Sequence, residues 1–483
     1  MDNELPGRWA AGIRGIAIVV ALTMVLAVLI YPWLHAYLVS WVAPWLGTIG
    51  AVGGLAAAAA LVLWRRPGRR LVEWIMKSSP RTFLWVVCTA SFILRWVILR
   101  VVDALPGREA PDIFGSWVFF EKSAIYPPGK HFVMTAVYFL LGDSYAAAVW
   151  FICAMVVAVV LMTYRLGRQA YGEPVARLAA AAIAFMPSWL LYGNLEYDLI
   201  LGFYEVLLVF LFFARPPERH TRWWLVLYGL ILGITCLVKP IAMIFPGVIF
   251  LLYLGRRVRP GAALAKSAII AVFMFVAIAP WTIRNCFVMG RFVLLSTNLG
   301  VILHTANNPD ANGLEMMMKP TAEMTDEVEM NRMRIRMAMR YIKDHPGHFV
   351  QLMGYRIVWT WGSDCGFVST TLYDKVSGTV MNLVRGVVQL PYILAIGLLG
   401  IGLLKYPTEI IRTVLHAVLF APIAYVWALH LVCQTHPQHH LPALPFILVL
   451  AAFVLVRASG APAGGEALSP ASVPAGGPKK STR

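Results

Sequence analysis

Residues 103–131 read DALPGREAPDIFGSWVFFEKSAIYPPGKH, a polar stretch between two strongly apolar ones. Only 13% of the whole chain is charged, yet this stretch contains seven charged residues and one histidine: Asp103, Arg108, Glu109, Asp112, Glu121, Lys122, Lys130 and His131. Ionisable side chains beside membrane helices are costly unless they serve a site. An ordinary solvated loop would carry the same charges without any chemistry. The rest of the chain has to decide between these two interpretations.

The composition is that of a membrane protein with several spans. Hydrophobic residues make up 59% of the chain and the mean hydropathy is +0.71. Apolar runs of about 20 residues recur, which is the length needed to cross a bilayer as a helix. Asp2 and Glu4 precede the first run, so we expect it to stay as a span and not to be cleaved as a signal peptide. We therefore predict an all-α polytopic membrane protein and exclude a soluble one.

The net charge of +17 does not indicate nucleic-acid binding, because the basic residues cluster in short connections between apolar runs. Such clusters mark the cytoplasmic side of a membrane protein. They predict both termini inside and about twelve spans. The Ala-, Arg- and Gly-rich composition and the compact loops favour a bacterial inner membrane. The six cysteines lie far apart with no CxxC pair, and we interpret them mostly as small apolar residues.

The predicted organisation has five parts. Residues 1–81 hold two spans and a cytoplasmic loop, residues 82–283 form the core with the outer loop 103–131, and residues 284–382 form an outer region with an amphipathic helix near 325–343. Residues 383–456 supply the last spans, and the Ala-, Gly- and Pro-rich residues 457–483 are expected to be a disordered inner tail.

Polar residues of mixed chemistry collect at the predicted outer ends of the helices, which is typical of a pocket. They are Asp112, Glu196, Asp198, Lys239, Arg284, Asn285, His304, Asn307 and Asn308. Each also has an ordinary structural explanation. Lys239 and Arg284 could extend to the membrane interface, and Glu196 and Asp198 could offset a helix dipole.

Three stretches carry a family resemblance: YPPGKHFVMTAVYFLLGDS at 126–144 with the residues from Arg95 before it, GITCLVKP at 233–240, and PWTIRN with NNPDANG between 280 and 313. In this order they resemble glycosyltransferase family 39, which has the GT-C fold and includes protein O-mannosyltransferases and the aminoarabinose transferases of lipid A. The similarity extends over about residues 82–456. The first two spans precede the family's usual first helix.

This resemblance implies transfer of a sugar from a polyprenyl-phosphate carrier to a lipid, glycan or protein acceptor on the external face. The family's first outer loop holds a catalytic acid, and Asp112 matches that position best. Many relatives have Asp-Glu there, whereas this chain has Asp112-Ile113. The aminoarabinose transferases place Glu-Lys before the two prolines, where this chain has Ile125-Tyr126.

The chemistry of such a transfer agrees with these residues. An acceptor hydroxyl must lose its proton as it attacks, so a carboxylate is a suitable base, and we assign this role to Asp112. The leaving lipid phosphate needs cationic or hydrogen-bonding partners. For these we expect Lys130, Lys239, Arg284, Tyr126, Asn307 and Asn308.

A divalent cation is a further expectation. Asp112, Glu196 and Asp198 would suit Mg or Mn, and His304 would suggest Zn. A mechanism that uses only cationic side chains is equally open. His436, His439 and His440 also resemble a metal site, although we favour a structural or carrier-headgroup role for them.

Two other functions remain open. A secondary transporter or lipid flippase would also have about twelve spans, with ionisable residues beside broken helices. A ligase that joins lipid-linked glycans is the third.

Overall fold

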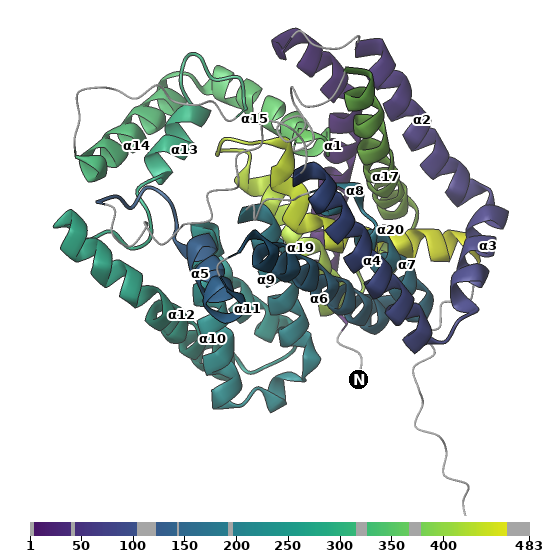
Figure 1. Cartoon of the computed structure of the whole chain (residues 1–483), viewed down its shortest axis with the longest axis horizontal. Helices are drawn as coiled ribbons and strands as arrows, with labels where there is room; N and C mark the ends of the chain where they lie inside the picture. Colours follow the sequence, from purple (N-terminus) through teal and green to yellow (C-terminus); the bar gives the residue numbers. More distant parts are fainter. Residues whose placement is uncertain are drawn as a thin grey trace, which may run out of the picture.

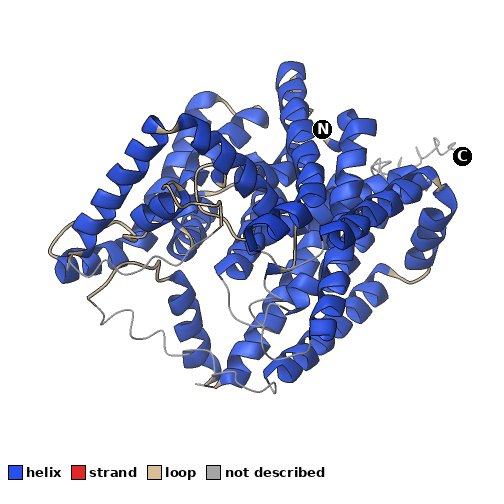
Figure 2. Cartoon of the chain, turned by 90° about the horizontal axis from the view of Figure 1, so that it is seen from above, coloured by secondary structure: helices blue, strands red, loops and turns tan. Residues whose placement is uncertain are grey.

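The structure is a computed structural model, and it describes residues 4–39, 44–103, 122–142, 144–191, 197–314, 326–366 and 378–460. Helices dominate these ranges, which contain only two isolated β-bridges and no strand (Figure 2). The predicted all-α class is therefore confirmed.

The helices of the first half are α1 (Gly7–Val39), α2 (Pro44–Leu63), α3 (Arg65–Met76), α4 (Pro80–Asp103), α5 (Gly129–Leu141), α6 (Tyr145–Tyr171), α7 (Glu173–Ala184), α8 (Pro187–Leu191), α9 (Tyr197–Ala214), the 3₁₀ helix η2 (Pro217–Arg219) and α10 (Arg222–Val238). Those of the second half are η3 (Pro240–Ile244), α11 (Phe245–Gly255), α12 (Pro260–Met289), α13 (Leu299–Ala306), α14 (Glu327–Asp344), α15 (Pro346–Trp361), α17 (Gly378–Lys405), α18 (Pro407–Ile410), α19 (Val414–Leu429), η4 (Pro437–Ala443) and α20 (Leu444–Ser459). Figure 1 shows their arrangement.

In the described ranges, six helical segments are long and apolar enough to cross a membrane, or seven if α2 and α3 count as one span bent by 78°. Four more apolar helices are shorter than a full span. The several membrane helices are thus confirmed, whereas the predicted number of twelve is not.

Breaks in the helices explain part of this difference. The apolar run at 174–191 is divided into α7 and α8, and Pro187 begins the second helix. Another break follows α10, where Lys239 has extended backbone and Pro240 starts η3. A proline cannot donate its backbone nitrogen to the preceding turn, so both breaks follow from the sequence.

α20 is the central helix of the bundle. It is apolar on all sides, and 94% of the most apolar stretch within Pro437–Ser459 is buried inside the protein. Gly402 of α17 lets the two helices approach closely, because a Cβ there would lie 2.1 Å from a methyl group of Val454. The C-terminal helix is thus a core element and not a lipid-facing one.

One end of the bundle gathers the basic connections, and we call it the basic end. There Leu5 N donates to Arg412 O, Tyr171 Oη donates to Ile410 O, and Gln169 Nε2 donates to Phe213 O. Contacts of this kind join connections far apart in sequence, so the positive charges form one face. The first and last described residues both lie there. The helix ends at 103, 197, 238, 289 and 444 therefore belong to the opposite end.

At the opposite end, the buried Arg356 of α15 holds two loops together. Its Nη1 donates to Leu431 O at 2.6 Å, and its Nη2 donates to Asn307 Oδ1 at 2.8 Å and to Ala306 O. Arg356 is fully buried. The loop after α13 and the segment after α19 are therefore fixed to each other through one guanidinium.

We predict that Arg356→Met destabilises the protein, because it removes the donors of three acceptors. Unsatisfied acceptors cost about 1–3 kcal/mol each, so the melting temperature of the detergent-solubilised protein should fall by about 5 °C or more. Arg340→Met is the matched control, since Arg340 is exposed on α14. An equal melting temperature for both variants would contradict this role.

Candidate functional site

The opposite end contains an ion pair between Asp198, in the first turn of α9, and Lys239, at the end of α10. The Asp198 side chain is 4% exposed and that of Lys239 is 23% exposed. The positive end of the α9 dipole also favours the carboxylate. Asp198, predicted to bind a metal, and Lys239, predicted to bind a phosphate, therefore form an ion pair with each other.

Glu205 lies two turns further along the same face of α9, and the sequence analysis missed it. It is buried, and its Oε2 has no hydrogen-bond partner among the residues that the structure describes. Lys239 and Asp198 are close enough for their charges to act on it. The signal was present, since Glu205 is the single charged residue in the apolar run 199–214, and such residues usually mark function.

The histidines after α19 face the same ion pair. The charge of Lys239 acts on His430 and His439, and that of Asp198 acts on His436. The rings of His430 and His439 stack with their centroids 4.7 Å apart. Burial lowers the pKa of His436, with a smaller opposing effect from Asp198. These histidines therefore lie near enough to the ion pair for its charges to act on them.

The YPPGK segment meets this cluster at Gly129. A Cβ on Gly129 would lie 2.3 Å from Val238 N and 2.4 Å from Leu237 C, so only glycine fits against the end of α10. Lys130 and Tyr126 lie near Gly129 in the sequence, and Gly129 contacts α10 directly before Lys239. The Tyr126 side chain is 62% exposed, whereas Lys130 is half-buried in the first turn of α5.

Arg284 connects the same segment to α12. Its Nη1 donates to Ser123 O at 2.8 Å and to Asn285 Oδ1 at 3.0 Å, and its guanidinium lies 4.6 Å from the ring centroid of Trp281. Asn285 Nδ2 in turn donates to Val293 O at 3.1 Å. The PWTIRN motif thus positions the chain that leads into YPPGK.

The NNP loop has a structural geometry. Asn307 is fully buried, and its Nδ2 donates to Leu303 O and Val432 O at 2.9 and 3.0 Å. Asn308 Nδ2 donates to His304 O at 2.8 Å at the end of α13. Burial, and secondly the charge of Arg334, lower the pKa of His304. Both amides therefore order the loop that supports the segment after α19.

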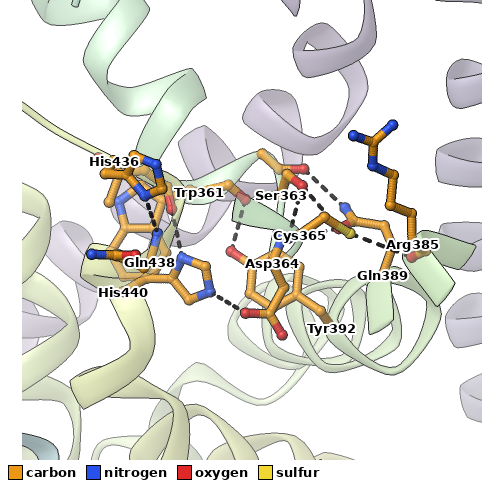
Figure 3. A network of polar contacts seen from close by, with 12 residues as sticks. Trp361, Ser363, Asp364, Cys365, Arg385, Gln389, Tyr392, His436, Gln438 and His440 are labelled. Atoms are coloured by element: carbon orange, nitrogen blue, oxygen red, sulfur yellow. Dashed lines mark hydrogen bonds and ion pairs between the residues drawn. The ribbon is translucent and has the colours of Figure 1, made fainter. Parts of the chain in front are cut away.

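A buried polar network holds η4 in place (Figure 3). His440 Nε2 contacts Asp364 Oδ1 at 2.9 Å, and His440 Nδ1 lies 2.7 Å from Thr360 O. A carbonyl can only accept, so Nδ1 is the donor. Asp364 N donates to Gln389 Oε1 at 2.9 Å, which joins the network to α17. This gives His440 a structural position beneath His436 and His439.

The described residues do not fit a divalent cation. Asp112 and Glu196 lie outside the described residues, and within those ranges no three His, Cys, Asp or Glu side chains are grouped to hold a metal. Asp198 is neutralised by the Lys239 ammonium, which would compete with a cation. Among the described residues, no carboxylate pairs with His304 to complete a zinc site.

Residues 126–283 match the family model of dolichyl-phosphate-mannose-protein mannosyltransferases. This range contains YPPGK, Asp198, Glu205 and Lys239, and it ends one residue before Arg284. The resemblance found in the sequence is therefore confirmed for this part of the chain. No curated protein sequence shows significant similarity to the chain.

Solved structures of the oligosaccharyltransferase of Archaeoglobus fulgidus are similar to this structure. The apo form has a TM-score of 0.40 at 14% identity, and the complex with an inhibitory peptide and a dolichol-phosphate has a TM-score of 0.37 at 12% identity. A third, with Zn and sulfate, has a TM-score of 0.37 at 13% identity. Each similarity covers 78% of this chain and 50% of the other, so the chain matches only half the length of those proteins.

We predict that Asp198 and Lys239 are energetically coupled. Removing one partner of a buried pair leaves an unpaired charge, which costs about 3–5 kcal/mol at full burial and less here because Lys239 is partly exposed. Lys239→Ala should therefore lower the melting temperature more than the double variant Asp198→Ala/Lys239→Ala does. The exposed pair of Glu329 and Arg336 is the control, and its removal should change little. Additive losses at Asp198 and Lys239 would refute the coupling.

Proposed function

Because residues 126–283 match the mannosyltransferase family, we propose that the chain is a membrane glycosyltransferase that takes a sugar from a polyprenyl phosphate. The acceptor lies on the face opposite the basic end, and it is a lipid, glycan or protein. The observation that carries the proposal is the contact of YPPGK with the end of α10, directly before Lys239, inside the matched range. The cytoplasmic assignment of the basic end, in a bacterial inner membrane, is part of this proposal.

Cationic side chains at this end suit a lipid phosphate. Lys239 is partly exposed and Lys130 is half-buried, and both adjoin the contact at Gly129. The carboxylate of Asp198 limits how much positive charge accumulates there, because it pairs with Lys239. Arg284 acts on the site by holding the chain before Tyr126. We therefore assign Lys239 and Lys130 to the phosphate and Arg284 to positioning.

The proposed step is a single displacement at the anomeric carbon. The acceptor oxygen forms a bond to this carbon while the bond from the carbon to the phosphate oxygen breaks. Asp112 takes the acceptor's proton, and the polyprenyl phosphate leaves with the bonding electron pair. Lys239 and Lys130 stabilise the charge that develops on that phosphate. The balance requires no metal, nucleotide or redox partner.

A lipid-linked-sugar transporter or flippase remains the second candidate, for a specific reason. Lys239, Asp198 and Glu205 lie beside the break between α10 and η3, and Tyr425 of α19 fixes that break by donating to Ile241 O at 2.7 Å. Broken helices with ionisable residues are common in transporters. Mass spectrometry of proteoliposomes separates the candidates. A transferase forms a glycosylated acceptor, whereas a transporter only moves the lipid-linked sugar across the bilayer.

We predict that Asp112→Asn abolishes transfer while the protein stays folded. Loss of a general base typically costs about 10²–10⁴ in rate, so product formation from a polyprenyl-phosphate sugar should fall at least a hundredfold. Asp310→Asn, at an exposed carboxylate after the NNP loop, is the control and should retain activity. Normal turnover by the Asp112 variant would exclude Asp112 as the base.

We also predict that Gly129→Ala impairs transfer. The added methyl group would meet the backbone of α10, so α5 must shift away from Lys239. Misplacement by about 1 Å can cost about a hundredfold in rate. Gly247→Ala is the matched control, since a Cβ there meets no atom within 4 Å. Equal product formation by the two variants would argue against the close contact as part of the site.

A further inference from the structure

An apolar groove runs along the outside of the bundle between α4 and α6. It has a volume of about 420 Å³ and is lined by Leu84, Trp85, Cys88, Thr89, Phe92, Val157 and Leu161. Trp85 is 76% exposed at its edge. Both helices are among the candidate membrane spans. An apolar groove on such a surface faces acyl chains and not water.

A second hollow of about 420 Å³ adjoins the groove at the basic end. It is lined by Ser79, Pro80, Arg81, Leu84, Tyr164, Arg165 and Arg168. Leu84 lines both hollows, so they adjoin at this side chain. We call the two hollows together the path, which has three arginines at one end and apolar side chains along the rest.

The arginines of this path carry excess positive charge. Arg81 and Arg165 are exposed, and neither forms an ion pair or a hydrogen bond through its side chain with another described residue. Arg168 lies 3.3 Å from Glu173, which also pairs with Arg177 at 2.7 Å. Glu173 additionally accepts a hydrogen bond from Tyr164. Glu173 is thus already shared by three described side chains, which leaves Arg81 and Arg165 available to an anion.

The length of the path matches one leaflet. From Arg81 to Phe92, α4 rises by eleven residues, or about 16 Å at 1.5 Å per residue. Half of a hydrocarbon core of about 30 Å is about 15 Å. A phosphate at the arginines would therefore place an acyl chain along the groove as far as the bilayer centre.

We propose that this groove binds an anionic phospholipid of the leaflet at the basic end. Arg81 and Arg165 hold its phosphate, and one acyl chain lies against Leu84, Cys88 and Phe92. The site lies at the other end of the bundle from Lys239, and the proposal does not depend on glycosyl transfer. A bound lipid would tie α4, which leads into the outer loop 103–131, to α6. A zwitterionic lipid offers the same chains but no net charge, so charge decides the selectivity.

The experiment is native mass spectrometry of the delipidated full chain titrated with phosphatidylglycerol or phosphatidylcholine. We expect one tightly bound phosphatidylglycerol per chain and weaker binding of phosphatidylcholine. Arg81→Gln/Arg165→Gln should weaken phosphatidylglycerol binding at least about tenfold. Arg66→Gln/Arg70→Gln removes the same charge from exposed positions on α3 and should leave the tight site intact.

A second variant tests the groove itself. Thr89→Trp fills the apolar channel without changing any charge, and it should also remove the tight phosphatidylglycerol. The proposal is overturned if phosphatidylcholine binds equally well, if the two double variants lose binding to the same extent, or if Thr89→Trp retains the lipid.

Discussion

The carboxylate of Asp198 is nearly inaccessible to solvent, and in that environment it needs the ammonium of Lys239. Lys239 can reach it because α10 stops before Pro240. The same ending exposes a stretch of backbone against which Gly129 packs. The helix break, the ion pair and the position of YPPGK thus depend on one another. The histidines after α19 then close the cluster from the C-terminal side.

The sequence predicted the helical class and the concentration of polar residues at one end of the bundle, because both depend on composition and spacing alone. It assigned Asp198 and Lys239 separately, since a pair 41 residues apart is visible only once α9 and α10 pack together. The predicted number of spans was not confirmed, in part because prolines divide apolar runs into shorter helices, as at Pro187. An asparagine such as Asn307 can bind a phosphate, but this one is buried and its amide donates to Leu303 O and Val432 O. Glu205 was predictable and was overlooked in favour of residues at helix ends.

The two ends of the bundle differ in the kind of interaction they use. At the basic end, exposed arginines share few acids, and their charge is available to a membrane surface. At the opposite end, buried polar side chains form contacts that fix loops, as Arg356 does with Asn307 and His440 does with Asp364. The first arrangement orients a protein in a bilayer. The second gives a rigid frame of the kind that substrate positioning needs.

The absence of a side chain at position 129 also limits how this protein can move. Two backbones in direct contact cannot slide past each other, so α5 and the end of α10 must travel as one unit. Any rearrangement near Lys239 then has to bend the chain outside this contact.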